Sequence, residues 1–327
     1  MMMRSVVRIV LACTAAAFFL RAPIAHVAYP DHPINLIVAY VPGGGTDIVA
    51  RALAPYLEKY LGGGAKIIVN NRGGAGGEIG FTAIANAPPD GYTIGFVNSP
   101  SIIGIAIERT AQYGTWQKFE LLGNVVDDPA SFAVATDSPI KDLAELAAFV
   151  KTNPGTLTVG TPGIGAPGHI AGMLFAKLAG GKINHVPYKG AGDVHAAMAG
   201  KHILMAAISI GEAYQGIKGG KPLRVLGQLS AGRTTIAPAL KTAKEQGFDL
   251  EVSSLRGIAG PKGMPADIRE RLVKAVAQAV TDPEFQAKSI QYYAPLRYLS
   301  PAQYEASLRA EDVKFRQLWK EAPWSDK

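Results

Sequence analysis

Two glycine-rich stretches contain the residues that could do chemistry. The first, PGGGTD at residues 42–47, follows an apolar run and precedes a helical pattern, and TPGIGAPGH at residues 161–169 has the same setting. A helix N-terminus offers unpaired N–H groups and partial positive charge, and glycines let an anion approach them. We therefore expect these loops to hold a carboxylate or a phosphate. The alternative is a tight turn in which Thr46 or Asp47 caps the helix.

A third loop and one histidine add candidate donors. The loop NSPS at residues 98–101 follows a predicted strand and offers hydroxyl and amide groups, although such residues also favour plain turns. His169 stands at a predicted helix start, where it could contact a ligand. His185, His195 and His202 lack ligand spacing and are expected at the surface or hydrogen-bonded within the protein.

Other chemistries lack their signatures. PGGGTD has neither the lysine nor the Ser/Thr ending of a P-loop. GIGAPG at residues 163–168 satisfies G-x-G-x-x-G, but no acidic residue closes the following strand. The chain has no G-x-S-x-G, no H-E-x-x-H and no Cys/His cluster. We therefore expect no cofactor, no metal and no enzymatic activity.

The elements that position these loops form a repeated βαβαβ pattern. Strands are predicted at residues 34–40, 66–69 and 92–97, with helices at 47–60 and 78–86. The order returns with strands at 157–160, 183–187 and 203–208 and helices at 170–178 and 194–199. Residues 42–45 match residues 162–165, 120 positions later, in Pro, Gly and Gly. The sequence thus predicts two similar α/β lobes, each a doubly wound sheet, with the ligand cleft between them.

The connections between the lobes follow from the remaining apolar runs. Residues 119–126 and 223–228 stand where the chain would cross between lobes. A strand at 252–258 and helices at 266–281, 283–292 and 301–320 are expected to complete the first lobe. The predicted domains are a signal peptide at 1–28, a first lobe at 29–125 and 229–327, and a second lobe at 126–228.

Residues 1–28 read as an export signal. Arg4 and Arg8 precede an apolar run at 9–20, which is shorter than the about 20 residues that span a bilayer, and cleavage is expected between Ala22 and Ala28. Cys13, the only cysteine, lies in this segment, so the mature chain would have no thiol. Removing the three Arg of this segment lowers the formal charge from +7 to +4. This mild excess favours anionic ligands and does not suggest nucleic acid.

An ordered set of motifs resembles one family along the whole predicted mature chain. The motifs are YPDHPINLIVAYVPGGGTDIVARALAPYL, VNNRGGAGGEIG, APPDGYTIGF, GTPGIGAPGHIAG and HVPYKGAGD. They are similar to the Bug-type receptors, the extracytoplasmic solute-binding proteins of tripartite tricarboxylate transporters. The resemblance implies a periplasmic two-lobed binding protein of type II-like fold. Such a protein, a monomer, closes on a small carboxylate (a di- or tricarboxylate, an aromatic acid or an amino acid) and passes it to membrane permease subunits.

The resemblance also implies the site residues. Two departures bear on the ligand: GKHILMAAISIGEA replaces the usual G-x-V-D segment, which puts a contact from Ser209 in doubt, and Leu255 stands where a Trp is common. Whether Tyr188 contacts the ligand stays open. The residues that match the family's ligand-binding loops are Gly44, Gly45, Thr46, Asp47, Asn98, Ser99, Ser101, Thr161, Gly165, Ala166 and His169.

Two further expectations concern mechanism and role. Neither glycine loop contains Lys or Arg, so backbone amides are expected to hold the carboxylate, Arg51 to matter little, and a larger side chain at Gly44 to do the most harm. Two other functions fit the same residues: a sensing receptor for a signalling partner, and an exported α/β enzyme acting on a carboxylate.

Overall fold

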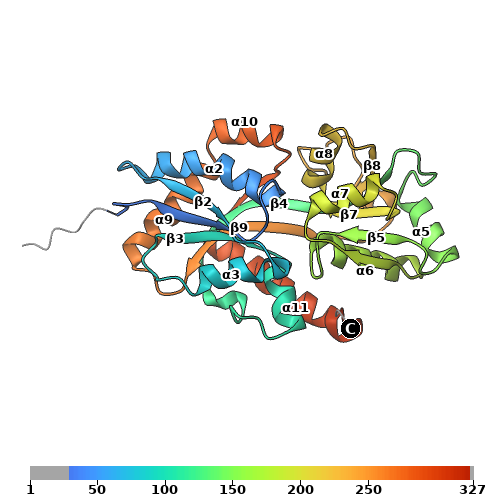
Figure 1. The fold of residues 1–327 in the computed structure, drawn as a ribbon, viewed down its shortest axis with the longest axis horizontal. Helices are drawn as coiled ribbons and strands as arrows, with labels where there is room; N and C mark the ends of the chain where they lie inside the picture. The colour runs from blue at the N-terminus through green and yellow to red at the C-terminus, as the bar shows by residue number, and fades with distance from the viewer. Residues whose placement is uncertain (1–28, 325–327) are drawn as a thin grey trace, which may run out of the picture.

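The computed structural model describes residues 29–324, so the predicted signal peptide and Cys13 lie outside the described residues. Two α/β lobes lie side by side along the long axis of the molecule (Figure 1). Within residues 29–324, no helix is both long and apolar enough to span a bilayer.

The first lobe is built on a mixed sheet. Strands β2 (Ile67–Asn71), β1 (Ile34–Val38) and β3 (Thr93–Asn98) are parallel neighbours, and β9 (Ser253–Pro261) runs antiparallel beside β3. Strand β10 (Leu296–Leu299) pairs with β4 (Phe119–Ala135). The helices of this lobe are α2 (Gly45–Leu61), α3 (Glu78–Ala85), α4 (Ser101–Glu108), α9 (Ala266–Val280), α10 (Pro283–Gln291) and α11 (Pro301–Glu321), with short 3₁₀ turns at η1 (Ala75–Gly77) and η2 (Trp116–Lys118).

The second lobe repeats the strand order of the first. Strands β6 (Asn184–Pro187), β5 (Thr158–Thr161) and β7 (Met205–Ser209) are parallel neighbours, and β4 runs antiparallel beside β7. Each lobe therefore orders its strands as second, first, third and then a long antiparallel strand, which confirms the predicted two-lobed fold with a repeated unit. The remaining elements are α5 (Leu143–Thr152), α6 (Pro167–Ala179), α7 (Ala191–Ala199), α8 (Ile210–Lys218), β8 (Leu223–Gln228) and the turn η3 (Lys244–Gln246).

Strand β4 joins the two sheets. Its first part pairs with β9, from Phe119 opposite Pro261 to Pro129 opposite Ser253, and its last residues pair with β7 and β8. The prediction that residues 223–228 cross between lobes is wrong, because this segment is β8 and lies beside the second half of β4. The chain returns to the first lobe through β9. An apolar run indicates a buried strand but not the sheet that it joins.

Residues 229–252 follow β8 and contact the second lobe. The backbone N–H of Ala243 donates to the carbonyl of Gln228, the Gln246 side chain accepts from the N–H of Leu143, and the Phe248 ring lies 5.2 Å from that of Phe175. The predicted lobe ranges stay a prediction, and these contacts favour moving residues 229–252 to the second lobe.

Burial on both faces explains why the sequence of β1 is apolar at every position except Asn35. Ile34, Leu36 and Val38 face the core that α2 and α9 cover, whereas Ile37 faces the core formed with α3. Because side chains alternate along a strand, both faces of this sheet are buried, as in other α/β sheets. The carboxyl ends of β1 and β3 are thereby fixed where their loops lead into α2 and α4.

Helix α11 connects the lobes outside the sheet. It packs on α4 and β4, and just beyond its end Trp324, 4% exposed, lies edge-on to the ring of His169 at 6.5 Å. Near the same end, Glu321 forms an ion pair with Lys177 of α6 at 2.8 Å. Figure 1 shows the C-terminal end of α11 reaching below the second lobe.

Candidate functional site

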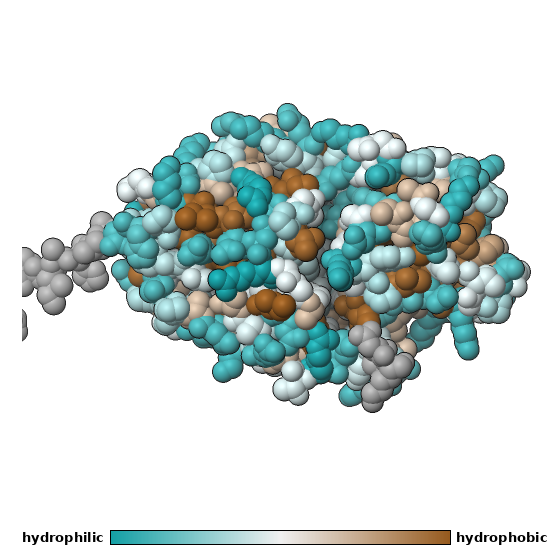
Figure 2. All heavy atoms as spheres, viewed as in Figure 1, coloured by the Kyte–Doolittle hydropathy of each residue, from teal (hydrophilic) through white to brown (hydrophobic). Residues whose placement is uncertain are grey.

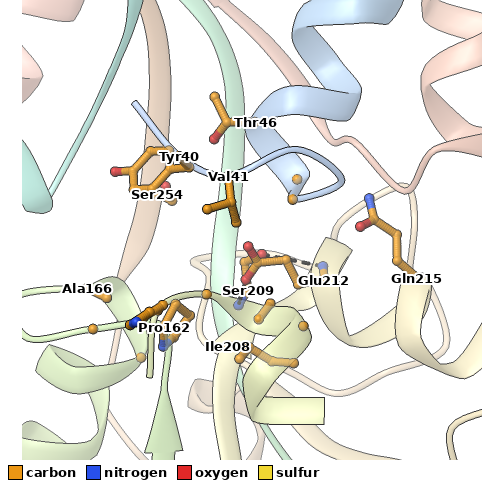
Figure 3. Close-up of a pocket in the computed structure, with 18 of the residues that line it drawn as sticks. Tyr40, Val41, Thr46, Pro162, Ala166, Ile208, Ser209, Glu212, Gln215 and Ser254 are labelled. Atoms are coloured by element: carbon orange, nitrogen blue, oxygen red, sulfur yellow. Dashed lines mark hydrogen bonds between the residues drawn. The ribbon is translucent and has the colours of Figure 1, made fainter. Parts of the chain in front are cut away.

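A cavity of about 400 Å³ lies between the lobes. Its walls come from the loops after β1 and β3 in the first lobe and the loops after β5, β6 and β7 in the second. The molecular surface is furrowed between the lobes, with apolar residues on both sides of the furrow (Figure 2). In Figure 3, Tyr40, Val41, Thr46 and Ser254 face Pro162, Ala166, Ser209 and Glu212 across the cavity.

Three helices begin at the cavity without a side-chain cap. The N-cap residues of α2, α6 and α7 are Gly44, Ala166 and Gly190; all three line the cavity, and none makes a side-chain capping bond. Each helix start carries unpaired N–H groups and about half a positive charge. Their convergence makes this cavity attractive to an anion.

Polar side chains of the first lobe complete this wall. The Asn98 amide donates to the Thr46 hydroxyl at 2.9 Å, and both residues are buried. Because the Thr46 oxygen accepts this bond, its own proton stays available to donate to a ligand. Six predicted site residues line the cavity: Gly44, Gly45, Thr46, Asn98, Ser101 and Ala166.

Asp47 does not line the cavity but holds the glycine loop from behind. Its carboxylate accepts from the N–H of Gly43 at 2.9 Å and from the Asn71 amide at 2.9 Å, and it forms an ion pair with Arg51. Burial alone would raise the pKa of Asp47, but the hydrogen bonds from Arg51, Gly43 and Asn71 together lower it. The exposed Arg51 also lies outside the cavity lining.

The second glycine-rich loop, residues 161–169, is also fixed by a side chain that lies outside the cavity lining. The His169 Nδ1 accepts from the N–H of Gly165 at 3.0 Å, and its ring stacks on that of His185. Burial lowers the pKa of His169 to about 3, so the ring is neutral. The Thr161 hydroxyl lies 2.7 Å from the Nε2 of His185. Four further predicted site residues are thus outside the cavity lining: Thr161, Gly165, His169 and the fully buried Ser99.

Arg256 is the cavity residue that sequence reasoning missed. It stands on β9, is 4% exposed and lines the cavity with Ser254. Its Nη2 donates to Asp128 at 2.7 Å and to Ser209 at 3.1 Å, while its buried Nε has no partner. A guanidinium here supplies the cation that the two glycine loops lack. The available signal was one arginine, the single charged residue of β9, on the same face as Ser254.

The carboxylate of Asp128, which does not line the cavity, forms an ion pair with the Arg256 guanidinium. It is 1% exposed, and its other oxygen accepts from the N–H of Gly211 at 3.0 Å. Burial raises the pKa of Asp128 to about 6, although the guanidinium of Arg256 favours its charged form.

Ser209 and Glu212 form a capping box at the start of α8. The Ser209 hydroxyl accepts from the N–H of Glu212, and the Glu212 carboxylate accepts from the N–H of Ser209 at 3.2 Å. Both residues line the cavity, so the Ser209 position, left in doubt by its sequence context, belongs to the cavity wall.

The structure shows which glycine of the loop at residues 42–47 comes closest to a neighbouring side chain. Gly44 has φ −79°, and a Cβ placed there would meet only the Val41 carbonyl oxygen at 3.7 Å. A Cβ at Gly45 would instead lie 2.6 Å from the Nη1 of Arg256. The close approach therefore occurs at Gly45, and the expectation that a larger side chain at Gly44 does the most harm to binding stays a prediction that this geometry does not favour.

The lobes touch each other at the rim of the cavity. A Cβ placed at Gly190 would lie 3.9 Å from Val41 Cγ2, and one at Gly104 would lie 3.5 Å from the Cα of Gly165. These pairs join different lobes, so the cleft is closed at these points. Within residues 29–324, no group of three or more His, Cys, Asp or Glu side chains could hold a metal ion.

Comparison with known families agrees with this architecture. The model of the tripartite tricarboxylate transporter family receptor matches residues 49–317. The chain belongs to this family. The receptor is therefore a solute-binding protein rather than an enzyme, and the resemblance found in its sequence motifs is confirmed.

Individual relatives cover most of the receptor. Protein BugT of Bordetella pertussis is 31% identical over 262 residues, 79% of each chain. A protein of Agrobacterium vitis encoded in the ttuE-ttuC' intergenic region is 32% identical over 88% of this chain and 82% of its own. Among solved structures, the periplasmic binding protein BugD is 32% identical with a TM-score of 0.80, covering 90% of this chain and 98% of its own. The structure of R. palustris Rpa4515 with adipate is 25% identical with a TM-score of 0.82, covering 89% and 97%.

Proposed function

We propose that this receptor captures a small carboxylate in the periplasm and delivers it to the permease subunits of a tripartite tricarboxylate transporter. The observation that carries the proposal is Arg256, a buried guanidinium with a free Nε, beside the uncapped start of α2. A charge-assisted bond to a carboxylate and the unpaired N–H groups of the helix favour the same ligand group. The relative solved with adipate has a carboxylate ligand in the same fold.

The site residues of this proposal come from both loops and from β9. We propose that Gly45, Thr46 and Arg256 contact the carboxylate directly. Asp47 and His169 instead fix the two glycine loops, because their hydrogen bonds go to the backbone of those loops. The remaining predicted residues that line the cavity, Gly44, Asn98, Ser101 and Ala166, complete the wall around the ligand.

The decisive experiment is ligand-induced stabilisation of protein freed of carried-over ligand by unfolding and refolding. A binding carboxylate at a hundredfold excess over Kd stabilises the native state by about 2.7 kcal/mol, which raises Tm without metal or nucleotide. A panel of carboxylates that leaves Tm unchanged would refute the proposal.

Cell fractionation tests the periplasmic location, and the mass of the fractionated protein tests the loss of residues 1–28. Size-exclusion chromatography tests the monomeric state. Co-purification with co-expressed permease subunits tests the partner.

A further inference from the structure

Glu212 is an unexpected group in a cavity that attracts anions. Its half-buried side chain lines the cavity, and Figure 3 shows its carboxylate pointing into the space beneath Val41. Among residues 29–324, its carboxylate accepts one hydrogen bond, from the N–H of Ser209, and forms no ion pair. The exposed Lys189 and Lys221 also line the cavity, but neither pairs with it. A carboxylate in this position is complementary to a cationic or donor group of a ligand.

Ser209 lies between this carboxylate and the guanidinium of Arg256. Its hydroxyl accepts from Arg256 Nη2 at 3.1 Å, and its N–H donates to Glu212 at 3.2 Å. A positive and a negative side chain therefore stand on either side of one residue. A ligand whose own carboxylate and ammonium are separated by one carbon atom presents the opposite charges at a similarly short spacing.

We infer that the receptor takes an α-amino acid with an uncharged side chain, with Arg256 and the start of α2 facing its carboxylate and Glu212 facing its ammonium. This inference rests on the proposed function and narrows its ligand class. Glu212 is thus a specificity-determining residue that nothing in the family match assigns.

The charge balance supports a zwitterion over a polycarboxylate. Arg256 is the buried cationic side chain of the cavity, and Asp128 already pairs with it. A di- or tricarboxylate would place at least two negative charges near Asp128 and Glu212, where Arg256 is the buried cation and the other cations of the wall, Lys189 and Lys221, are exposed to solvent. Uncompensated buried charge is costly, whereas a zwitterion adds no net charge.

Aliphatic side chains form a large part of the remaining wall, and this surface fits an uncharged side chain. Residues from the loops after β1 and β5, from helix α2 and from strand β7 provide aliphatic surface. Closing the lobes over such walls excludes water and strengthens both charge pairs. The aliphatic residues are Val41, Pro42, Ile48, Pro162, Ile164 and Ile208.

The test compares each amino acid with the acid that lacks its amine. Calorimetry on stripped protein should show leucine, valine or another uncharged amino acid binding at least tenfold more tightly than its des-amino acid. The N-acetylated amino acid, which keeps the carboxylate but loses the ammonium charge, should also bind at least tenfold more weakly. Both comparisons use the unaltered protein, so they do not depend on a variant that folds.

The variant Glu212→Gln should reduce the ratio between amino acid and des-amino acid by at least tenfold. Gln also completes a capping box, so α8 keeps its start. Glu145→Gln is the matched control, because Glu145 accepts from a backbone N–H at the start of α5, in an arrangement with Asp142 outside the cavity. This control should keep the ratio of the unaltered protein.

The outcomes separate the two proposals. Equal binding of des-amino or N-acetylated acids, or a ratio that survives Glu212→Gln, overturns the amino-acid inference and leaves a carboxylate receptor. Absence of binding by every carboxylate, with or without an amine, overturns the proposed function itself. Tight binding of tricarboxylates with no amino acid bound also overturns the inference.

Discussion

The Nη2 of Arg256 and the Oγ of Ser209 are 3.1 Å apart and belong to different lobes. Arg256 stands on β9 beside the first-lobe strand β3, and Ser209 ends β7 and caps α8 in the second. The side chain proposed to face the ligand carboxylate therefore also joins the lobes. The Arg256 guanidinium therefore takes part both in the proposed recognition of the ligand and in the contact that holds the two lobes together.

Replacing Arg256 by Lys should weaken carboxylate binding. Lysine keeps the charge near Asp128 but lacks the planar fork that reaches several acceptors at once. Loss of one bond to the charged ligand is expected to cost about 1.5–3 kcal/mol, measured by calorimetry. Arg51→Lys is the control, because Arg51 is exposed and outside the cavity. Equal losses in the two variants would contradict this assignment.

Gly45→Ala should weaken binding far more than Gly44→Ala. The new Cβ at position 45 would lie 2.6 Å from Nη1, so the Arg256 guanidinium must move, whereas position 44 has φ −79° and a new Cβ there would make only an ordinary contact, 3.7 Å from the Val41 carbonyl oxygen. Ligand titration of both variants measures the difference. Equal affinity of the Gly45 variant and the unaltered protein would show that the guanidinium has no role at the start of α2.

Carboxylate binding should tighten as pH falls from 8 to 5. In the folded protein, burial and the nearby Glu212 together raise the pKa of Asp128 to about 6 against the opposing effect of Arg256. A ligand carboxylate at Arg256 adds negative charge beside Asp128 and raises this pKa again. Binding therefore takes up protons near pH 6, and protonation of Asp128 frees the guanidinium for the ligand.

Proton uptake is measured by calorimetry at pH 6 in two buffers of different ionisation enthalpy. The same titration on Asp128→Asn should show no uptake from this residue and a smaller pH dependence. Affinity that weakens on acidification between pH 8 and 6 would refute the prediction.

Gly104→Leu should hold the lobes apart. Gly104 on α4 faces Gly165 of the other lobe, and a Cβ there already lies 3.5 Å from the Gly165 Cα, which leaves no room for the rest of a leucine. Small-angle scattering at saturating ligand should give a larger radius of gyration than the unaltered protein. Gly104→Ala makes an ordinary contact and serves as the control. Superimposable curves for the leucine variant would exclude a tight lobe contact at this point.

The sequence predicted the repeated βαβαβ unit because local signals define it. A glycine-rich loop after an apolar strand and before a helical pattern is a strong marker, and the match between residues 42–45 and 162–165 locates the same loop in both lobes. These loops lie at the cavity with Gly44, Gly45, Thr46 and Ala166 in its wall.

Arg256 could not be placed in this way. Its importance depends on the pairing of β9 with β4, which brings Arg256 opposite Asn98 and Val126 in the sheet and its side chain beside Asp128. No local pattern encodes a pairing between residues so far apart in the chain. The family resemblance predicts Asp47 and His169 as ligand contacts, and His169 also stands at a helix start, yet both side chains bind loop backbone. The position of a residue in the sequence predicts which loop it belongs to, but it does not predict whether its side chain points toward the cavity or toward the loop backbone.

The shared strand β4 has a consequence for the order of assembly during synthesis. The second-lobe strands β5 to β8 follow β4 in the chain, and β7 and β8 can pair with its last residues as soon as they emerge, while β5 and β6 join the same sheet beyond β7. The first sheet stays open between β3 and β4 until β9, ending at Pro261, is made and fills the gap. The lobe that begins first is therefore finished last. A chain interrupted before β9 would expose two unpaired strand edges, which are templates for aggregation.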